Sequence, residues 1–278
     1  MSAPASVEVW SGKDRGDENF PVGSVLIRRA LRPHVHAFYA FARNADDIAD
    51  SPALATEDKV ARLDLMEDVL LGRSEAGSPS ALRLRASLAE TGVTARHACE
   101  LLVAFRQDAT KRRYASWAEL YEYCRFSAMP VGRHVLDLHR ENLATHTPSD
   151  ALCVALQVLN HLQDAAKDLE GLDRCYLPQD LLDRHGGAVR DLRGAKASPG
   201  LRAVFDALLD EVDLLNQAAG ELPRRTRDRR LRTETAVIVG LARRLARRLR
   251  RGDPVAKRVA LTKADIGASV LAALRFLP

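Results

Sequence analysis

Two segments of the sequence carry oxygen-bearing side chains at every fourth position, and this spacing limits what the chain can fold into. The first segment holds Asp46 and Asp50, and the second holds Asn160, Asp164 and Asp168. A step of four residues places side chains one above another on a single helix face. Two carboxylates about 5 Å apart repel by roughly 1 kcal/mol in water, whereas a shared divalent cation reverses the sign of the interaction. Both segments are therefore predicted to be helical.

A solvated surface is the alternative explanation for the first segment taken alone. The second segment favours cation binding, because its polar side carries amides, an imidazole and aspartates, with only Lys167 nearby: Gln157, Asn160, His161, Asp164 and Asp168. Oxygen donors of this kind suit a hard cation. We interpret His161 as a hydrogen-bonding neighbour, since nothing else in reach suggests a zinc ligand set.

The spacing of apolar residues predicts an all-α fold, because it is helical almost everywhere and aromatic residues are few. No linker, low-complexity tract or repeat interrupts the chain, so we expect one domain over residues 1–278, with 1–16 flexible. The first acidic helix is expected to run from near Pro33 to Ser51. The second is expected to have Thr147 as its N-cap and to end before Gly171.

A third helix is expected over 117–138, with Pro130 and Gly132 in its interior. These two residue types cost about 3 and 1 kcal/mol in a helix interior, so they mark a kink. The small side chains at the kink leave room for a ligand, and packing against a neighbouring helix is the competing explanation.

Positive charge is concentrated in one part of the chain. The net charge is +5, and twelve arginines lie between Arg224 and Arg251. In the later part of this region apolar residues form a stripe opposite the arginines: Val237, Ile238, Leu241, Leu245 and Leu249. A solvated helix face is the common explanation, and anionic lipid or nucleic acid are the functional ones. We prefer lipid and expect no nucleic-acid partner, because no nucleic-acid-binding module accompanies the patch.

The cysteines and the hydropathy profile bear on location. The four cysteines have no zinc-like spacing and are interpreted as reduced thiols of a cytosolic protein. No signal peptide is evident, and no apolar run is long enough to span a bilayer. We expect a cytoplasmic protein with peripheral contact to the inner face of the membrane.

Taken together, these motifs resemble the squalene/phytoene synthase family. The pattern Tyr39-x-x-x-Arg43-x-x-Asp46-x-x-x-Asp50 is similar to the first aspartate-rich motif of that family. The second motif is similar to Asn160-x-x-x-Asp164-x-x-x-Asp168, followed by Arg174-x-Tyr176-Leu-Pro178 and Asp180. The segment from Tyr123 to Gly132 resembles the kinked central helix, and the match extends over about residues 17–187.

The resemblance implies the isoprenoid synthase fold, a helical bundle around a central cavity with two facing aspartate-rich motifs. It also implies a prenyl diphosphate substrate, C30 or C15, and about three Mg²⁺ ions that bind the diphosphate. The implied metal ligands are Asp46, Asp50, Asn160, Asp164 and Asp168, and Tyr39 joins the four aspartates as a catalytic residue. The implied substrate-binding residues are Arg43, Asn160, Arg174, Tyr176, Phe20, Phe38, Phe126, Met129, Val131, Gly132 and Gln157. Ordinary core packing is the alternative for the apolar residues of this set.

Segments 17–24 and 127–133 are most similar to the bacterial hopanoid-pathway branch called HpnC. That similarity implies a hydroxysqualene synthase acting on presqualene diphosphate, in association with other squalene-pathway enzymes. One departure is Gln163, where many phytoene and dehydrosqualene synthases carry Arg. Two alternatives stay open: a condensing synthase that joins two prenyl diphosphates, and a non-catalytic assembly or scaffold protein. Termination by hydride is less favoured than termination by water. No residue that positions such a water is identified, and Asn160, His161 and Gln163 are the candidates.

Overall fold

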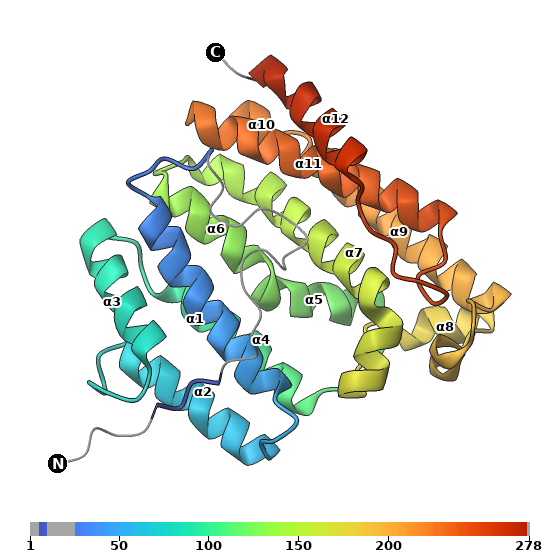
Figure 1. Ribbon diagram of the computed structural model, residues 1–278, viewed down its shortest axis with the longest axis horizontal. Helices are drawn as coiled ribbons and strands as arrows, with labels where there is room; N and C mark the ends of the chain where they lie inside the picture. The colour runs from blue at the N-terminus through green and yellow to red at the C-terminus, as the bar shows by residue number, and fades with distance from the viewer. Residues whose placement is uncertain (1–5, 10–25, 277–278) are drawn as a thin grey trace. The chain divides into compact units, whose positions relative to one another are not determined.

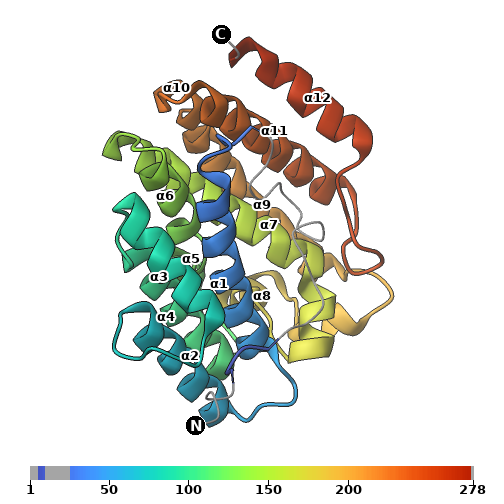
Figure 2. The same cartoon turned by 60° about the vertical axis from the view of Figure 1, so that its left-hand side comes forward.

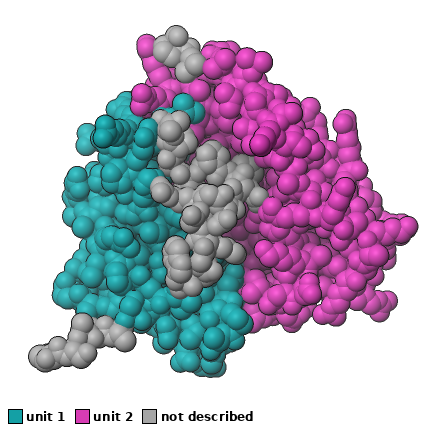
Figure 3. Space-filling model, viewed as in Figure 1, with its two compact units in different colours: residues 1–111, 133–140 teal, residues 112–132, 141–278 magenta. Residues whose placement is uncertain are grey.

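The computed structural model describes residues 6–9 and 26–276, and within these residues every regular element is a helix (Figure 1). The predicted all-α class is therefore confirmed. The predicted segment 17–24, including Phe20, lies outside the described residues, as does most of 1–16. Backbone contacts divide the chain into two compact units, shown in Figure 3: residues 1–111 with 133–140, and residues 112–132 with 141–278. This division does not decide the single-domain prediction, which stays a prediction.

The first unit contains four complete helices: α1 (Arg32–Asp50), α2 (Thr56–Leu70), α3 (Pro79–Thr91) and α4 (Arg96–Thr110). Helix α1 packs against α3 and α4, and α2 packs against the same two helices. Buried apolar side chains from all four helices form one core, which includes Phe41, Ile48, Met66, Leu84 and Leu102. The apolar face of α1 therefore points into this core.

The second unit is built around the long helix α7 (His146–Leu172), which packs most extensively against α9 (Pro199–Ala219). Helix α11 (Arg229–Arg251) contacts α7, α9 and α12 (Lys263–Ala273). The shorter elements of this unit are α5 (Trp117–Ser127), α8 (Gln179–His185), α10 (Leu222–Arg225), η1 (Leu143–Thr145), η2 (Val189–Arg193) and η3 (Leu274–Phe276). Figure 2 shows α12 lying along the outer side of α11.

The ends of the two acidic helices were predicted with different success. Helix α1 begins one residue before Pro33 and ends at Asp50, as expected. Helix α7 begins earlier and ends later than expected, because a 3₁₀ turn capped by Asn142 starts it and Asp173 ends it in the left-handed region (φ 50°). The predictions that Thr147 is an N-cap and that the helix ends before Gly171 were therefore wrong. Asp173 is held there by Arg113, whose guanidinium donates to its carboxylate at 2.7 Å.

The predicted helix over 117–138 is two helices, because the backbone breaks at Ala128 and Pro130 falls in the first turn of α6 (Met129–Leu138). Proline is tolerated there, since the first-turn N–H groups have no partner within the helix. Gly132 faces α7: a Cβ at this position would meet the Cys153 Sγ at 2.6 Å and the Ser149 Oγ closer still. The absence of a side chain therefore allows α6 and α7 to approach closely, and the predicted substrate contact of Gly132 stays a prediction.

Replacement of Gly132 by Ala should destabilise the protein by about 1–3 kcal/mol, because the added methyl group overpacks the contact with Ser149 and Cys153. Chemical unfolding followed by circular dichroism measures the change. Gly171→Ala is the matched control, because it lies in α7 with nothing within 4 Å of the added Cβ. The control should be neutral or slightly stabilising. Equal stabilities of Gly132→Ala and the unmodified chain would contradict the packing role.

Candidate active site

The first acidic stripe lies in the last two turns of α1, where one arginine serves several carboxylates. The Arg43 guanidinium donates to the Asp47 Oδ1 through Nε at 3.0 Å and through NH2 at 2.6 Å. Its third nitrogen, NH1, lies 3.1 Å from the Asp46 Oδ2. Asp47 is buried, so the sequence prediction missed a residue that holds Arg43 in place. Its i,i+4 spacing from Arg43 was the signal that could have identified it.

The carboxylates of this stripe repel one another, and Arg43 offsets only part of the repulsion. The pKa of Asp46 is raised from its usual 3.8 to about 8, first by removal from bulk water and then by repulsion from Asp50. Arg43 acts in the opposite direction, while the buried Asp108 of α4 and Asp47 add to the rise. The carboxylates that act on Asp46 supply oxygen ligands and negative charge, which are what a divalent cation requires.

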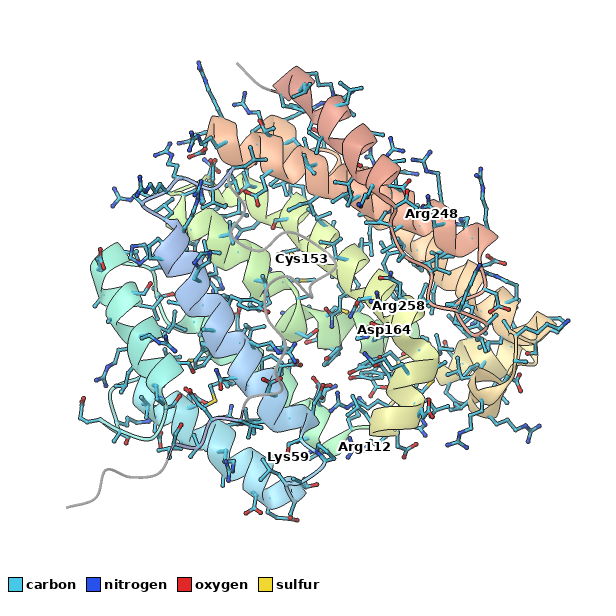
Figure 4. All side chains as sticks on the ribbon, in the orientation of Figure 1. Lys59, Arg112, Cys153, Asp164, Arg248 and Arg258 are labelled. Carbon is cyan, nitrogen blue, oxygen red and sulfur yellow. The ribbon has the colours of Figure 1, made fainter. Side chains whose placement is uncertain are left out.

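Two more residues fix the surroundings of this stripe. The buried Lys59 of α2 donates from Nζ to the Ala49 carbonyl oxygen at 2.9 Å and so binds the end of α1 (Figure 4). Phe38 is buried in the core of the first unit and stacks on His134, with ring centroids 3.8 Å apart. The structure therefore gives Phe38 a core-packing role, while Tyr39, one position further on, is only half-buried.

The second acidic stripe lies on α7, where Asn160, Asp164 and Asp168 are all half-buried. Asp164 is paired with Arg258, which reaches it from the segment between α11 and α12 (Figure 4). The Arg258 Nε donates to the Asp164 Oδ1 at 2.8 Å, and its NH2 donates to Oδ2 at 3.3 Å. This two-point contact raises the pKa of Arg258. The sequence analysis missed Arg258, because no local pattern connects residues 94 positions apart.

Gln163 helps to hold the segment that carries Arg258. Its buried amide donates from Nε2 to the Val259 carbonyl oxygen at 2.6 Å. The start of the same segment is fixed by Arg202, which donates to the Leu249 and Gly252 carbonyl oxygens at 3.0 Å. Gln163 is thus a structural anchor, which argues against its candidacy as the residue that positions a water molecule.

A buried aromatic cluster includes one side chain of α7. His161 stacks on Tyr176 with ring centroids 3.6 Å apart, and Tyr123 and Tyr114 complete the group. Burial, followed by the charge of Arg174, lowers the pKa of His161 to about 3, so its imidazole is neutral near pH 7. Its Nε2 lies 3.3 Å from the Gln157 Nε2, in agreement with the predicted role as a hydrogen-bonding neighbour.

Arg174 and Tyr176, both predicted to bind substrate, lie together in this cluster. Both are buried, and the Arg174 NH1 donates to the Tyr176 hydroxyl at 3.3 Å. The structure places Met129 in the interior, leaves Phe126 half-buried and exposes Val131. Their predicted contacts with substrate stay predictions.

No three His, Cys, Asp or Glu side chains converge on one metal position within residues 6–9 and 26–276. In proteins, Mg²⁺ usually keeps several waters and binds one or two carboxylates together with substrate phosphates. The acidic stripes supply carboxylate and amide oxygens, which are the ligands that such an ion prefers.

Comparison with known proteins adds independent information. A family model described as squalene/phytoene synthase matches residues 13–265. The chain is 48% identical over 254 residues to a hydroxysqualene synthase of Rhodopseudomonas palustris, a match that covers 91% of this chain and 87% of the relative. It is 43% identical to the hydroxysqualene synthase of Zymomonas mobilis, with 95% and 89% covered. The crystal structure of squalene synthase HpnC from Alicyclobacillus acidocaldarius superimposes with a TM-score of 0.74 at 32% identity, covering 85% of this chain and 90% of that one.

Replacement of Asp46 by Asn should stabilise the metal-free protein, and the gain should grow with pH. The folded-state pKa of about 8 lies above the usual 3.8, so the folded state keeps a proton that the unfolded chain releases. Stability is therefore lost as the pH rises between these two values. Because 34% of the Asp46 side chain is exposed, screening limits the expected gain to about 1–2 kcal/mol near pH 8.5.

Urea unfolding in the presence of a chelator, at about pH 5 and about pH 8.5, measures this gain. Asp58→Asn on the exposed side of α2 is the control and should show no such pH dependence. A loss of stability in Asp46→Asn at the higher pH would contradict the electrostatic account.

Proposed function

Because the chain belongs to the squalene/phytoene synthase family, we propose that it is a hydroxysqualene synthase acting on presqualene diphosphate. The observation that carries this proposal is the similarity to proteins named hydroxysqualene synthase over nine tenths of the chain. In the proposed reaction the C–O bond breaks and diphosphate leaves with the electron pair. The carbocation rearranges, and a water oxygen attacks it and releases a proton.

We assign the two acidic stripes to Mg²⁺ binding, with about three ions expected from the family resemblance. Asp46 and Asp50 would provide ligands from α1, and Asn160, Asp164 and Asp168 from α7. Bound Mg²⁺ would polarise the diphosphate and stabilise it as a leaving group. The raised pKa of Asp46 supports this assignment, since it shows that Arg43 does not offset the repulsion between the carboxylates of the stripe.

Arginine side chains would complete the neutralisation of the leaving group. Arg43 is held in position by Asp47, so its guanidinium is oriented before substrate binds. Arg258 lies on Asp164 and would be released towards the diphosphate when a cation takes over that carboxylate. Preorganised charges of this kind favour the transition state, because little reorganisation is needed when the bond breaks.

The rings near α7 would suit the carbocation that follows. Tyr123 and Tyr176 offer aromatic faces, which attract cations. The neutral imidazole of His161 does not repel a positive charge, whereas a protonated one would. We propose that Gln157, which lies next to His161, helps to orient the attacking water.

A condensing synthase that joins two prenyl diphosphates is the second candidate, and one observation favours it. Gln163 lacks the positive charge that many condensing relatives carry at that position, but Arg258 brings a cation to the neighbouring Asp164. A non-catalytic scaffold is not favoured, because a scaffold has no use for a stripe of closely spaced, mutually repelling carboxylates. We further propose peripheral contact with the inner face of the membrane, and association with other squalene-pathway enzymes.

Purified protein with Mg²⁺ should convert presqualene diphosphate into hydroxysqualene, identified by the mass of the apolar extract. Asp164→Asn should lower turnover by about 100-fold or more, because a ligand to the leaving-group cation is lost. Asp183→Asn, an exposed residue of α8, is the control and should leave turnover unchanged. Unchanged circular dichroism would show that the site variant is folded.

Two outcomes would redirect the assignment. Product from farnesyl diphosphate alone would establish the condensing synthase and overturn the proposed reaction. Full activity of Asp164→Asn would exclude the α7 stripe as the metal site, whatever the substrate.

Replacement of Arg258 by Ala should strengthen Mg²⁺ binding to the substrate-free protein several-fold. The reason is that the guanidinium occupies Asp164 and competes with the ion for its carboxylate. Isothermal titration calorimetry with MgCl₂ measures the change. Arg248→Ala is the control, because Arg248 binds Asp265 at the start of α12 and not Asp164. Weaker Mg²⁺ binding in Arg258→Ala than in the control would show that Arg258 does not compete with the ion.

A further inference from the structure

Helix α12 is turned so that its large apolar side chains face outward. Ile266, Val270 and Leu271 of α12 and Leu274, the first residue of the following η3, are 47%, 45%, 69% and 45% exposed. These four account for almost half of the nine exposed large apolar side chains among the described residues, and they fall within nine consecutive positions. On a helical projection they lie on one side, so they form a single apolar strip, which we call the α12 face.

The buried side of α12 adjoins the α12 face at Ile266 and is formed by small residues. Ser269 and Ala273 are 1% and 2% exposed. Ser269 lies so close to Gly240 of α11 that a Cβ on this glycine would come within 3.2 Å of the Ser269 Cβ and Oγ. This close approach leaves no room for the aliphatic side chains, so α12 cannot bury them against α11 by rotating about its axis.

Polar contacts at the start of α12 fix the same orientation. Asp265 accepts hydrogen bonds from the backbone N–H and the hydroxyl of Thr262, and the Arg248 guanidinium of α11 donates to the same carboxylate. In Figure 1 and in Figure 2, α12 lies on the outer side of α11. The exposure of the α12 face is therefore built into the packing of α11 and α12.

The charged residues near the α12 face are mostly basic. Residues 254–276 include four Lys and Arg residues and one acidic residue. The single acidic residue of 254–276, Asp265, is paired with Arg248. Lys263 and Arg275 at the two ends of the face make no ion pair with any residue that the structure describes. An apolar strip flanked by basic side chains is typical of helices that lie in the interface of an anionic membrane.

We propose that the α12 face docks this protein on an anionic lipid bilayer, with the four aliphatic side chains in the acyl boundary and the basic residues at the headgroups. The choice of lipid over protein rests on the proposed function, whose substrate and product both carry a C30 hydrocarbon chain. Pairing with a second copy is disfavoured, because a symmetric contact would bring Lys263 and Arg275 against the same charges of the partner. None of the helices in the described part of the chain has the length and apolar character of a bilayer span.

The test is co-sedimentation of the full chain with vesicles, without substrate or Mg²⁺. Vesicles of phosphatidylcholine with about 30% phosphatidylglycerol should bind the unmodified chain, and binding should weaken in about 0.5 M salt. The double variant Val270→Ser with Leu271→Ser should bind about tenfold more weakly, since two inserted side chains are lost. Leu214→Ser is the matched control, because Leu214 lies on α9 and is 61% exposed. This control should bind as the unmodified chain does.

Equal vesicle binding by the double variant and the Leu214→Ser control, or no binding by the unmodified chain, would overturn the proposal. A lipid-free dimer in sedimentation velocity that the double variant loses would also overturn it, because the face would then join two copies. Turnover of detergent-solubilised presqualene diphosphate should be equal in all three proteins. Binding without turnover would reject only the proposed function, and turnover without binding would reject only the docking surface.

Discussion

Repulsion between carboxylates on neighbouring turns of one helix is the constraint that shapes the α1 stripe. Asp46, Asp47 and Asp50 lie within five positions, and partial burial strengthens their repulsion because water screens it less. Arg43 relieves only part of this charge. Such a site is less stable than a neutral one would be, and a divalent cation is the ligand that removes the penalty. At the proposed metal site, a bound cation would relieve this electrostatic cost.

In the α7 stripe, the charge of one carboxylate is neutralised by an arginine of the same unit. Arg258 neutralises Asp164, and the segment that carries Arg258 is fixed at two points: Gln163 binds Val259 beside it, and Arg202 binds Gly252 at its start. Any cation that takes Asp164 must therefore compete with a positioned guanidinium. Metal binding at the proposed site would therefore be linked to the position of this segment, since the ion and Arg258 would exclude each other at one carboxylate.

The fold class and both acidic stripes could be predicted from the sequence, because helical spacing is a local signal. The ends of α7 could not, since they depend on a 3₁₀ turn before the helix and on the contact of Asp173 with Arg113. The positions of Arg258 and of the cluster of Tyr114, Tyr123 and Tyr176 could not be predicted from the sequence for a related reason. Their members are far apart in the chain, and only tertiary packing brings them together.

The basic region shows why a count of charges does not locate an interaction surface. The sequence suggested that the arginines of 224–251 form the lipid-binding face, but several of them bind protein groups within the second unit. Arg250 pairs with Asp210 and Asp213, and Arg243 donates to the Asn216 carbonyl oxygen. Part of this charge is thus used to join α11 to α9. Most apolar residues of α11 are buried in the core. The exposed apolar surface lies on α12, where small residues pack against α11 and the large ones face outward.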